Sequence, residues 1–272
     1  MSEMWNGVAP GWDQQADLVD RQTAVATEAM LDAAAVGPGC TVLDVACGPG
    51  GAGIAAAGRV GETGRVVLAD IAFAMVEIAD RRSAGLPHVT SVVSDQMALD
   101  AAGASFDAVI CRHGLMFVAD PATAVREAVR VLRPAGRYAT LTWDARASNP
   151  WLGLALDAVG EQFGMTVPPP GVPGPFSLDD QVLLADTLSA GGLAEVQVQR
   201  VPTPMAASSV SAWWDQVQQL AGPVALMLAG LEPDVREAIR QRALAHGERV
   251  ARPAEDGIYF DGSALLGSGR RP

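Results

Sequence analysis

The chain has 272 residues, which suffice for one large domain or for a domain of about 150 residues with a smaller partner. A formal net charge of −12 and a pI near 4.6 disfavour nucleic acids and anionic membranes as partners. The three cysteines form no CxxC pair, the three histidines lack metal-ligand spacing, and no apolar run is long enough to enter a membrane, so we expect a cytoplasmic protein without a metal site.

Residues 1–40 are expected to form an N-terminal helical cap. The pattern over Ala16–Ala35 predicts a helix, and the polar stretch before it holds Trp5 and Trp12. Two tryptophans in such a stretch favour a segment that lies over a ligand.

Residues 41–145 alternate short apolar runs with helical patterns, which predicts βα units and a parallel, doubly wound sheet. The expected strands are Thr41–Ala46, Arg65–Asp70, His88–Val93, Phe106–Arg112 and Arg137–Trp143. The expected helices are Gly50–Arg59, Phe73–Ala84 and Pro121–Leu132, with a stop at Pro134-Ala135-Gly136.

Residues 146–272 are expected to hold a substrate or lid region and the last strands of the sheet. The proline-rich stretch Val167–Pro175 predicts a loop or hinge, and Ser177 is expected to cap a helix over Ser177–Gly191. The remaining elements are strands over Ala194–Val201 and Ala264–Ser268, and inserted helices over Val210–Ala221, Pro223–Leu231 and Pro233–Val250.

The first strand leads directly into a glycine loop and a helix. Gly48, Gly50 and Gly53 match G-x-G-x-x-G, and Asp70 lies where a dinucleotide enzyme keeps its ribose-binding acid, so an NAD-dependent oxidoreductase is one reading. Asp44, four residues before the first glycine, would repel a pyrophosphate. An acid there suits a ligand with a cationic end, or it only orders the loop.

Several motifs in order resemble those of class I S-adenosylmethionine (SAM)-dependent methyltransferases, and among them the small-molecule group similar to the ubiquinone/menaquinone-biosynthesis enzymes. The matching stretches are Val42–Gly50, Leu68–Val76, Ser94–Met97, Ser105–Ile110 and Arg126–Gly136, where Ala135 departs from the family's glycine. The resemblance implies an α/β fold with a doubly wound, mostly parallel seven-stranded sheet and an inserted helical lid.

The resemblance also implies the cofactor, SAM, with S-adenosylhomocysteine as product, and the residues that bind it. Asp70 would take the ribose hydroxyls, Ile71 and Met75 the adenine side, and Asp95 the adenine amino group. The full expected set is Asp44, Ala46, Gly48, Gly50, Asp70, Ile71, Met75, Asp95, Gln96 and Arg112. Independently of the family, Asp44, Asp70 and Asp95 each follow or end a predicted strand, at the edge where open α/β sheets bind ligands.

On the acceptor side, His113 directly after the fourth strand is the candidate catalytic base, with a cleft-rim role as the alternative. Arg112 either touches the carboxylate of SAM or lies at the rim. Apolar side chains of the inserted helices favour a lipophilic or aromatic small-molecule acceptor, although most of them would pack as core and an exposed lid helix would also suit a homodimer surface. They are Trp213, Trp214, Leu226, Met227 and Leu228, with Trp151 and Phe163 after the fifth strand and Asp144 and Tyr259 as further rim candidates.

Together these patterns predict methyl transfer to a small, fairly apolar acceptor, with the methylated atom (O, N or C) open. A SAM-binding cyclase on the same fold remains an alternative, because fold and cofactor motifs do not determine the chemistry. The oxidoreductase reading is weakened because the chain contains no lysine and so no tyrosine–lysine pair. A SAM-sensing or scaffold protein is the remaining reading.

Overall fold

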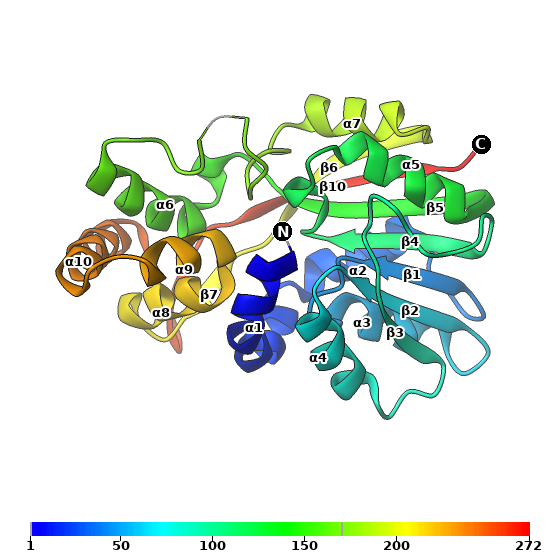
Figure 1. Cartoon of the computed structure of the whole chain (residues 1–272), viewed down its shortest axis with the longest axis horizontal. Coiled ribbons are helices and arrows are strands. Elements are labelled where there is room, and N and C mark those ends of the chain that lie inside the picture. The colour runs from blue at the N-terminus through cyan, green and yellow to red at the C-terminus, as the bar shows by residue number, and fades with distance from the viewer. Residues whose placement is uncertain (1, 170) are drawn as a thin grey trace.

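The computed structural model describes residues 2–169 and 171–272, and within them seven strands form one sheet (Figure 1). The spatial order is β3-β2-β1-β4-β5-β10-β6, and β10 runs in the opposite direction to the other six of these strands. The strands are β1 (Thr41–Val45), β2 (Arg65–Asp70), β3 (Val89–Val93), β4 (Phe106–Arg112), β5 (Leu132–Trp143), β6 (Ala194–Pro202) and β10 (Ser263–Arg270). The expected doubly wound, mostly parallel seven-stranded sheet is confirmed.

Helices cover both faces of the sheet because successive side chains of each strand point to opposite faces. Val42 packs in the core with α2 and α3, whereas Leu43 packs in the core with α5 and α7. The flanking helices are α2 (Ala24–Ala33), α3 (Gly51–Val60), α4 (Phe73–Ser83), α5 (Pro121–Val131) and α7 (Gln181–Ala190), with short 3₁₀ turns at Leu115–Phe117 and Arg146–Ser148.

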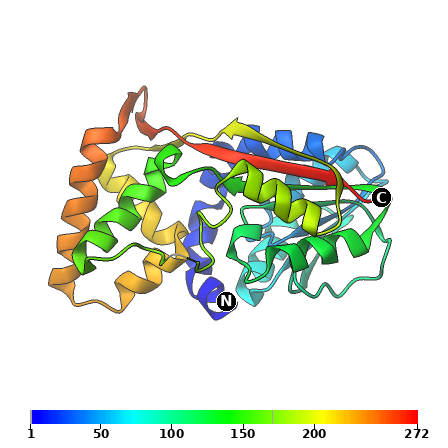
Figure 2. The same ribbon diagram turned by 90° about the horizontal axis from the view of Figure 1, so that it is seen from above.

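The inserted helices form a separate layer beyond one end of the sheet, seen from above in Figure 2. Trp213 is buried in this layer, where its Nε1 donates to the Trp151 carbonyl at 2.7 Å and its ring lies 4.9 Å from that of Phe260. The helices are α6 (Pro150–Phe163), α8 (Val210–Leu220), α9 (Gly222–Ala229) and α10 (Pro233–Val250), and a small antiparallel sheet joins them, in the order β7 (Met205–Ala207), β9 (Gly257–Phe260), β8 (Arg252–Ala254).

The first helix, α1 (Ser2–Gln22), lies between the sheet and the inserted helices (Figure 1). Trp12 Nε1 donates to the Leu220 carbonyl of α8 at 3.1 Å, and Asp13 pairs with Arg81 of α4 at 2.6 Å. The N-terminal cap therefore bridges the two halves of the molecule.

Two expectations for helix ends are wrong. The single helix expected over Ala16–Ala35 is two helices separated at Thr23, whose hydroxyl donates back to the Val19 carbonyl at 2.7 Å. Helix α7 is capped by Asp180, which accepts from two backbone N–H groups, and not by Ser177. The Ser177 hydroxyl instead donates to the Met116 carbonyl at 2.6 Å.

Other differences concern short or irregular segments. Neither α6 nor the small sheet was expected, β10 is longer than Ala264–Ser268, and Pro134-Ala135-Gly136 lies inside β5 rather than before it. Ala135 has φ +66° and adjoins an irregularity in the β4–β5 register, so the chain turns there without leaving the strand. In residues 2–169 and 171–272, no helix is both long and apolar enough to cross a membrane.

Candidate active site

The glycine loop joins β1 to α3 through three left-handed residues, Ala46 with φ +53° and two glycines. Gly48 has φ +54° and Gly50 has φ +88°, a conformation that glycine adopts at little cost. A Cβ on Gly50 would lie 3.1 Å from Leu68 and 3.2 Å from Ala79, so the loop also packs closely against β2 and α4. These glycines let the first strand turn sharply into the helix that follows it.

Asp70, at the end of β2, fixes the neighbouring loops. Its Oδ2 accepts from the Gly48 N–H at 2.9 Å, and its Oδ1 accepts from the Ala72 N–H at 2.9 Å. Burial raises the pKa of Asp70, although the backbone hydrogen bonds oppose this shift. The carboxyl group thus holds the glycine loop against the start of α4.

Asp44 lies behind the glycine loop and is fully buried. Its Oδ2 accepts from the Gly53 N–H at 2.8 Å, while its Oδ1 finds no partner among the described residues. Burial raises the pKa of Asp44 to about 7, against the opposing influence of Arg112. Asp44 therefore holds the glycine loop from the protein interior, through its hydrogen bond from the Gly53 N–H.

A cavity of about 650 Å³ opens at the carboxyl edge of the parallel strands. Of the expected cofactor residues, the structure brings together Ala46, Gly48, Asp70, Ile71, Met75, Asp95, Gln96 and Arg112 on its wall. Asp44 and Gly50 are not part of the described lining. Asp95 is oriented by the Met97 N–H at 2.8 Å, and Gln96 Nε2 donates to the Gly114 carbonyl at 3.3 Å.

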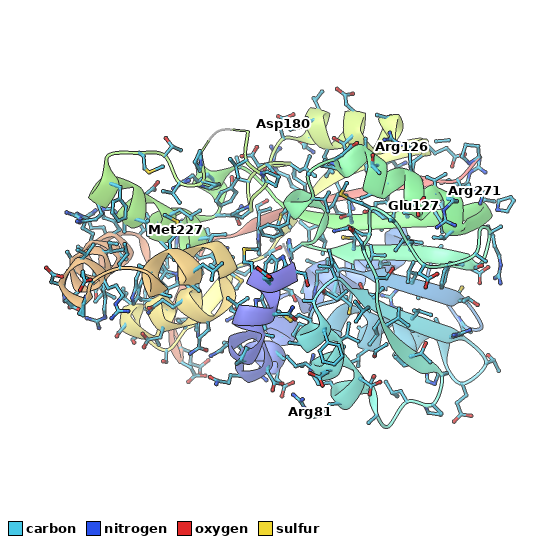
Figure 3. The ribbon with its side chains drawn as sticks, viewed as in Figure 1. Arg81, Arg126, Glu127, Asp180, Met227 and Arg271 are labelled. Atoms are coloured by element: carbon cyan, nitrogen blue, oxygen red, sulfur yellow. The ribbon has the colours of Figure 1, made fainter. Side chains whose placement is uncertain are left out.

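The rest of the same cavity is largely apolar. Among the inserted helices, Met227 of α9 reaches the wall, and Figure 3 shows this residue on the side of the molecule away from Arg126, Glu127 and Arg271. The apolar lining also includes Trp5, Trp12, Phe117, Trp143, Trp151, Leu152, Leu156, Met165, Val167, Val172, Met205 and Val224. The two N-terminal tryptophans, Trp5 and Trp12, therefore both border this cavity.

His113 lies on the cavity wall in a left-handed conformation, with φ +58°. Its ring stacks on Trp143, and both ring nitrogens are buried without a hydrogen-bond partner in the described part of the chain. Burial and then the nearby Arg112 charge lower the pKa of His113 to about 3. The imidazole is therefore neutral at physiological pH, with one donor and one acceptor nitrogen.

Arg112 also borders the cavity, but its guanidinium is already engaged. Nη2 pairs with Asp20 at 2.8 Å, and Nη1 donates to the hydroxyls of Thr23 at 2.9 Å and Thr27 at 3.1 Å. Arg112 thus connects the end of β4 to α1 and α2. Because its guanidinium is already paired, this placement agrees better with a position at the cavity rim than with a free receptor for the carboxylate of SAM.

Several candidates from the sequence lie elsewhere. Trp213 and Trp214 are core residues, and Leu226 is 48% exposed. Asp144 accepts from Arg200 Nε at 2.8 Å and from Ser263 Oγ at 2.9 Å in a structural junction of the sheet. Leu228 is buried, Phe163 is exposed, and Tyr259 belongs to β9; the described lining includes none of these residues.

Some cavity residues were not anticipated. The Val167–Pro175 stretch, expected to be only a loop or hinge, lines the cavity in its described part, and so does Thr23 at the break between the first two helices. The proline run was the available signal, because it excludes helix and carries apolar side chains. Nothing in the sequence indicated that Thr23 would line the cavity, because its position depends on a break between α1 and α2 that the hydrophobic pattern did not show.

Comparison with known proteins places this geometry in a family. The methyltransferase domain family matches residues 43–140. The 2-phytyl-1,4-naphtoquinone methyltransferase of Nostoc punctiforme is 33% identical over 156 residues, which are 56% of this chain and 67% of that protein. The ubiquinone/menaquinone biosynthesis C-methyltransferase UbiE of Hydrogenovibrio crunogenus is 35% identical over 130 residues, which are 47% of this chain and 51% of that protein.

A solved structure supports the fold. The YcgJ protein from Bacillus subtilis superposes with a TM-score of 0.60 at 20% identity, covering 90% of this chain and 97% of that chain. The chain spans only 31% and 46% of the length of two other curated relatives. Because the domain match begins at the first strand and includes the glycine loop, and two thirds of a naphthoquinone methyltransferase align at 33% identity, the chain belongs to the class I SAM-dependent methyltransferase family.

Proposed function

We propose that the protein transfers the methyl group of SAM to a small, fairly apolar or aromatic acceptor and releases S-adenosylhomocysteine. The observation that carries this proposal is the single cavity of about 650 Å³ in which the glycine loop and the strand-end acids meet an apolar chamber. Because donor and acceptor would share one cavity, they can be held in contact, which can supply much of the rate of an in-line displacement.

The residues on the glycine-loop side fit SAM chemically. Each carboxylate oxygen of Asp70 accepts one backbone N–H and retains a lone pair that suits a ribose hydroxyl. Asp95 has one oxygen on the Met97 N–H, and its carboxylate suits the adenine amino group. The apolar side chains of Ile71 and Met75 would cover the adenine ring.

Bound SAM would supply an electrophilic methyl group, so the chain's own task is to orient the acceptor and to exclude water. The aromatic walls at Trp143 and Trp151 suit a planar or lipophilic acceptor. In the described lining, Arg112 is the one cationic side chain, and it is already paired with Asp20. That pairing favours an uncharged acceptor over a carboxylate or phosphate ester.

His113 is the proposed catalytic residue on the acceptor side. Its neutral imidazole has an unshared acceptor nitrogen at neutral pH, so it can take a hydrogen bond, and finally the proton, from the acceptor's nucleophilic group. A pKa near 3 makes it a weak base. Its contribution is therefore chiefly to orient and polarise the nucleophile as the methyl group is transferred.

The three segments of the chain divide this work in the proposed scheme. Residues 41–145 hold the cofactor, residues 146–272 supply the acceptor chamber and complete the sheet, and residues 1–40 cover the site. The contacts of Trp5 and Trp12 with the cavity, and the bond from Trp12 to α8, support the covering role.

Calorimetric titration of the purified protein with SAM, S-adenosylhomocysteine and NAD tests the cofactor assignment. We expect binding of SAM and its product in the micromolar range and no NAD signal. NAD binding alone would overturn the proposal. Incubation with SAM and a panel of neutral aromatic, lipophilic and charged acceptors, read by mass spectrometry, then identifies the methylated atom. A cyclase would convert its substrate while SAM stayed intact.

A further inference from the structure

The carboxylate of Asp20, on α1, is held between two arginines. It accepts from Arg82 Nη2 at 2.7 Å and from Arg112 Nη2 at 2.8 Å. Arg82 also donates to the Pro49 carbonyl of the glycine loop at 2.8 Å and pairs with the exposed Asp17 at 3.1 Å. Although burial acts to raise it, these guanidinium groups hold the pKa of Asp20 below its ordinary value, so the group is an anion.

Asp20 also lies against the first residue of α3. A Cβ on Gly51 would lie only 1.8 Å from Asp20 Oδ1 and 2.5 Å from Oδ2, so glycine is required for the carboxylate to come this close. The start of a helix favours an anion, because its first N–H groups point outward and its dipole is positive there. Two arginines and a helix start thus surround one intramolecular carboxylate.

The position of Asp20 bears on ligand choice because the adjoining glycine loop matches the G-x-G-x-x-G pattern of dinucleotide-binding proteins. In G-x-G-x-x-G loops, the pyrophosphate lies at the start of the helix, where a glycine allows the close approach. We propose that Asp20 is a specificity-determining residue whose carboxylate fills this anion position, so that the site rejects phosphate-bearing ligands and favours one that brings a cationic ammonium group to the loop. The inference rests on the proposed function for the identity of that preferred ligand, SAM.

Charge repulsion by Asp20 and competition for its two arginines both support the exclusion of phosphate-bearing ligands. A phosphate that approached Gly51 would meet the Asp20 carboxylate and would have to displace it from Arg82 and Arg112. The chain contains no lysine that would offer a substitute cation. The exposed pair Asp13–Arg81 joins the same two helices, α1 and α4, without a comparable approach to the glycine loop, and it supplies a matched control (Figure 3 labels Arg81).

The test compares Asp20→Asn and Asp20→Ala with wild type and with Asp13→Asn, using inorganic pyrophosphate and NAD as probes in calorimetric titrations at constant ionic strength. Removing the carboxylate leaves two guanidinium groups to bind the probe, so we expect both Asp20 variants to gain at least about tenfold in pyrophosphate affinity. Wild type and Asp13→Asn should show no such gain. Equal pyrophosphate affinity in all four proteins overturns the proposal.

Loss of stability in the Asp20 variants is also informative. If the carboxylate fills an anion position, pyrophosphate should raise the melting temperature of Asp20→Ala more than chloride at matched ionic strength does, and should leave that of Asp13→Asn unchanged. A destabilised Asp20→Ala that pyrophosphate does not rescue contradicts the inference.

A parallel titration with SAM separates the two proposals. If wild type binds no SAM, the proposed function fails, whatever the pyrophosphate results are. If wild type binds SAM and the Asp20 variants gain nothing for pyrophosphate, only the role of Asp20 is wrong.

Discussion

The imidazole of His113 lies flat on the indole of Trp143, with ring centroids 4.0 Å apart and planes inclined by 11°. The backbone of His113 is left-handed, a conformation that costs a residue with a side chain about 1 kcal/mol or more. Since the stack and the backbone turn together fix a ring whose nitrogens are unpaired among the described residues, the arrangement favours a functional role over a packing role.

Replacing His113 by phenylalanine keeps the stack and removes both nitrogens. We expect SAM affinity to stay unchanged and kcat to fall about 100-fold or more, which is typical for loss of a proton-accepting group. Steady-state kinetics with calorimetry of SAM binding measures both quantities. His246→Gln is the matched control, because His246 also has a buried, unpartnered nitrogen in the described structure but lies on α10 outside the cavity lining.

The pH profile gives a second readout for the same residue. With a pKa of about 3, His113 stays neutral through the physiological range. We therefore expect the pH profiles of kcat for wild type and His113→Phe to have the same shape near pH 6.5. An inflection at that pH, removed by the substitution, would mean that the ring is solvated and titrates normally. Wild-type turnover in His113→Phe would falsify its catalytic role.

Asp70→Ala should weaken SAM binding about 100-fold, because it removes the acceptor for the ribose hydroxyls and also releases the Gly48 and Ala72 N–H groups. Asp70→Asn retains one carbonyl oxygen and should lose less. Asp100→Ala, at an exposed carboxylate outside the cavity lining, should bind SAM as wild type does. Unchanged SAM affinity in Asp70→Ala would show that the cofactor is placed wrongly.

The sequence was most informative where one signal decides the structure. The run Val42–Val45 is apolar except for Asp44, and it is a buried central strand because both faces of a parallel sheet are covered. Asp70 and Asp95 follow or end strands, so their meeting at one sheet edge could be predicted without coordinates. Short strands such as β7 carry too few residues for any periodicity to be read.

Long-range polar partners could not be predicted in this way. Asp20 and Arg112 are 92 positions apart, and neither residue type nor spacing indicates that they pair. The burial of Asp44 behind the glycine loop, rather than on the cavity wall, depends on a hydrogen bond from the Gly53 N–H that only the folded turn creates. The left-handed turn at His113 likewise follows from how the chain leaves β4, not from a local signal.

Asp44→Asn should change how stability depends on pH. Burial raises the folded-state pKa of Asp44 from 3.8 to about 7, so its contribution to stability is complete below about pH 4 and is lost as the pH rises through about 7. Relative to Asp44→Asn, wild type should therefore lose stability as the pH rises from about 5 to about 7 and change little from there to pH 8, with a total loss of a few kcal/mol at most. Urea unfolding of both proteins across this range measures the difference.

The control for Asp44 is Asp107→Asn. Hydrogen bonds from the Thr41 N–H and from Arg133 outweigh burial and hold the pKa of Asp107 below its ordinary value. Its contribution is present above about pH 4 and is lost as the pH falls further, so the difference between wild type and Asp107→Asn should be flat from about pH 5 to pH 8. A flat difference for Asp44 as well would contradict its raised pKa.

Asn6 tests whether α1 is part of the cofactor site. Its Oδ1 accepts from the Ala74 N–H at 2.9 Å, which caps α4 from another helix because Ala72 at the N-cap has no side-chain oxygen. Loss of a cap costs about 1 kcal/mol, so Asn6→Ala should lower the melting temperature by about 2–4 °C. It should also weaken SAM binding several-fold, since α1 is linked to the Ile71 carbonyl through Ser2 Oγ at 3.0 Å.

Asp180→Ala separates this effect from general loss of stability. Asp180 caps α7 through the Val182 and Leu183 N–H groups, outside the described cavity lining, and Figure 3 shows it away from α1 and α4. Its removal should lower the melting temperature by a similar amount and leave the dissociation constant for SAM unchanged. If both variants weaken SAM binding equally, α1 acts only through overall stability. If only Asn6→Ala does so, α1 holds the segment between β2 and α4 in its binding geometry.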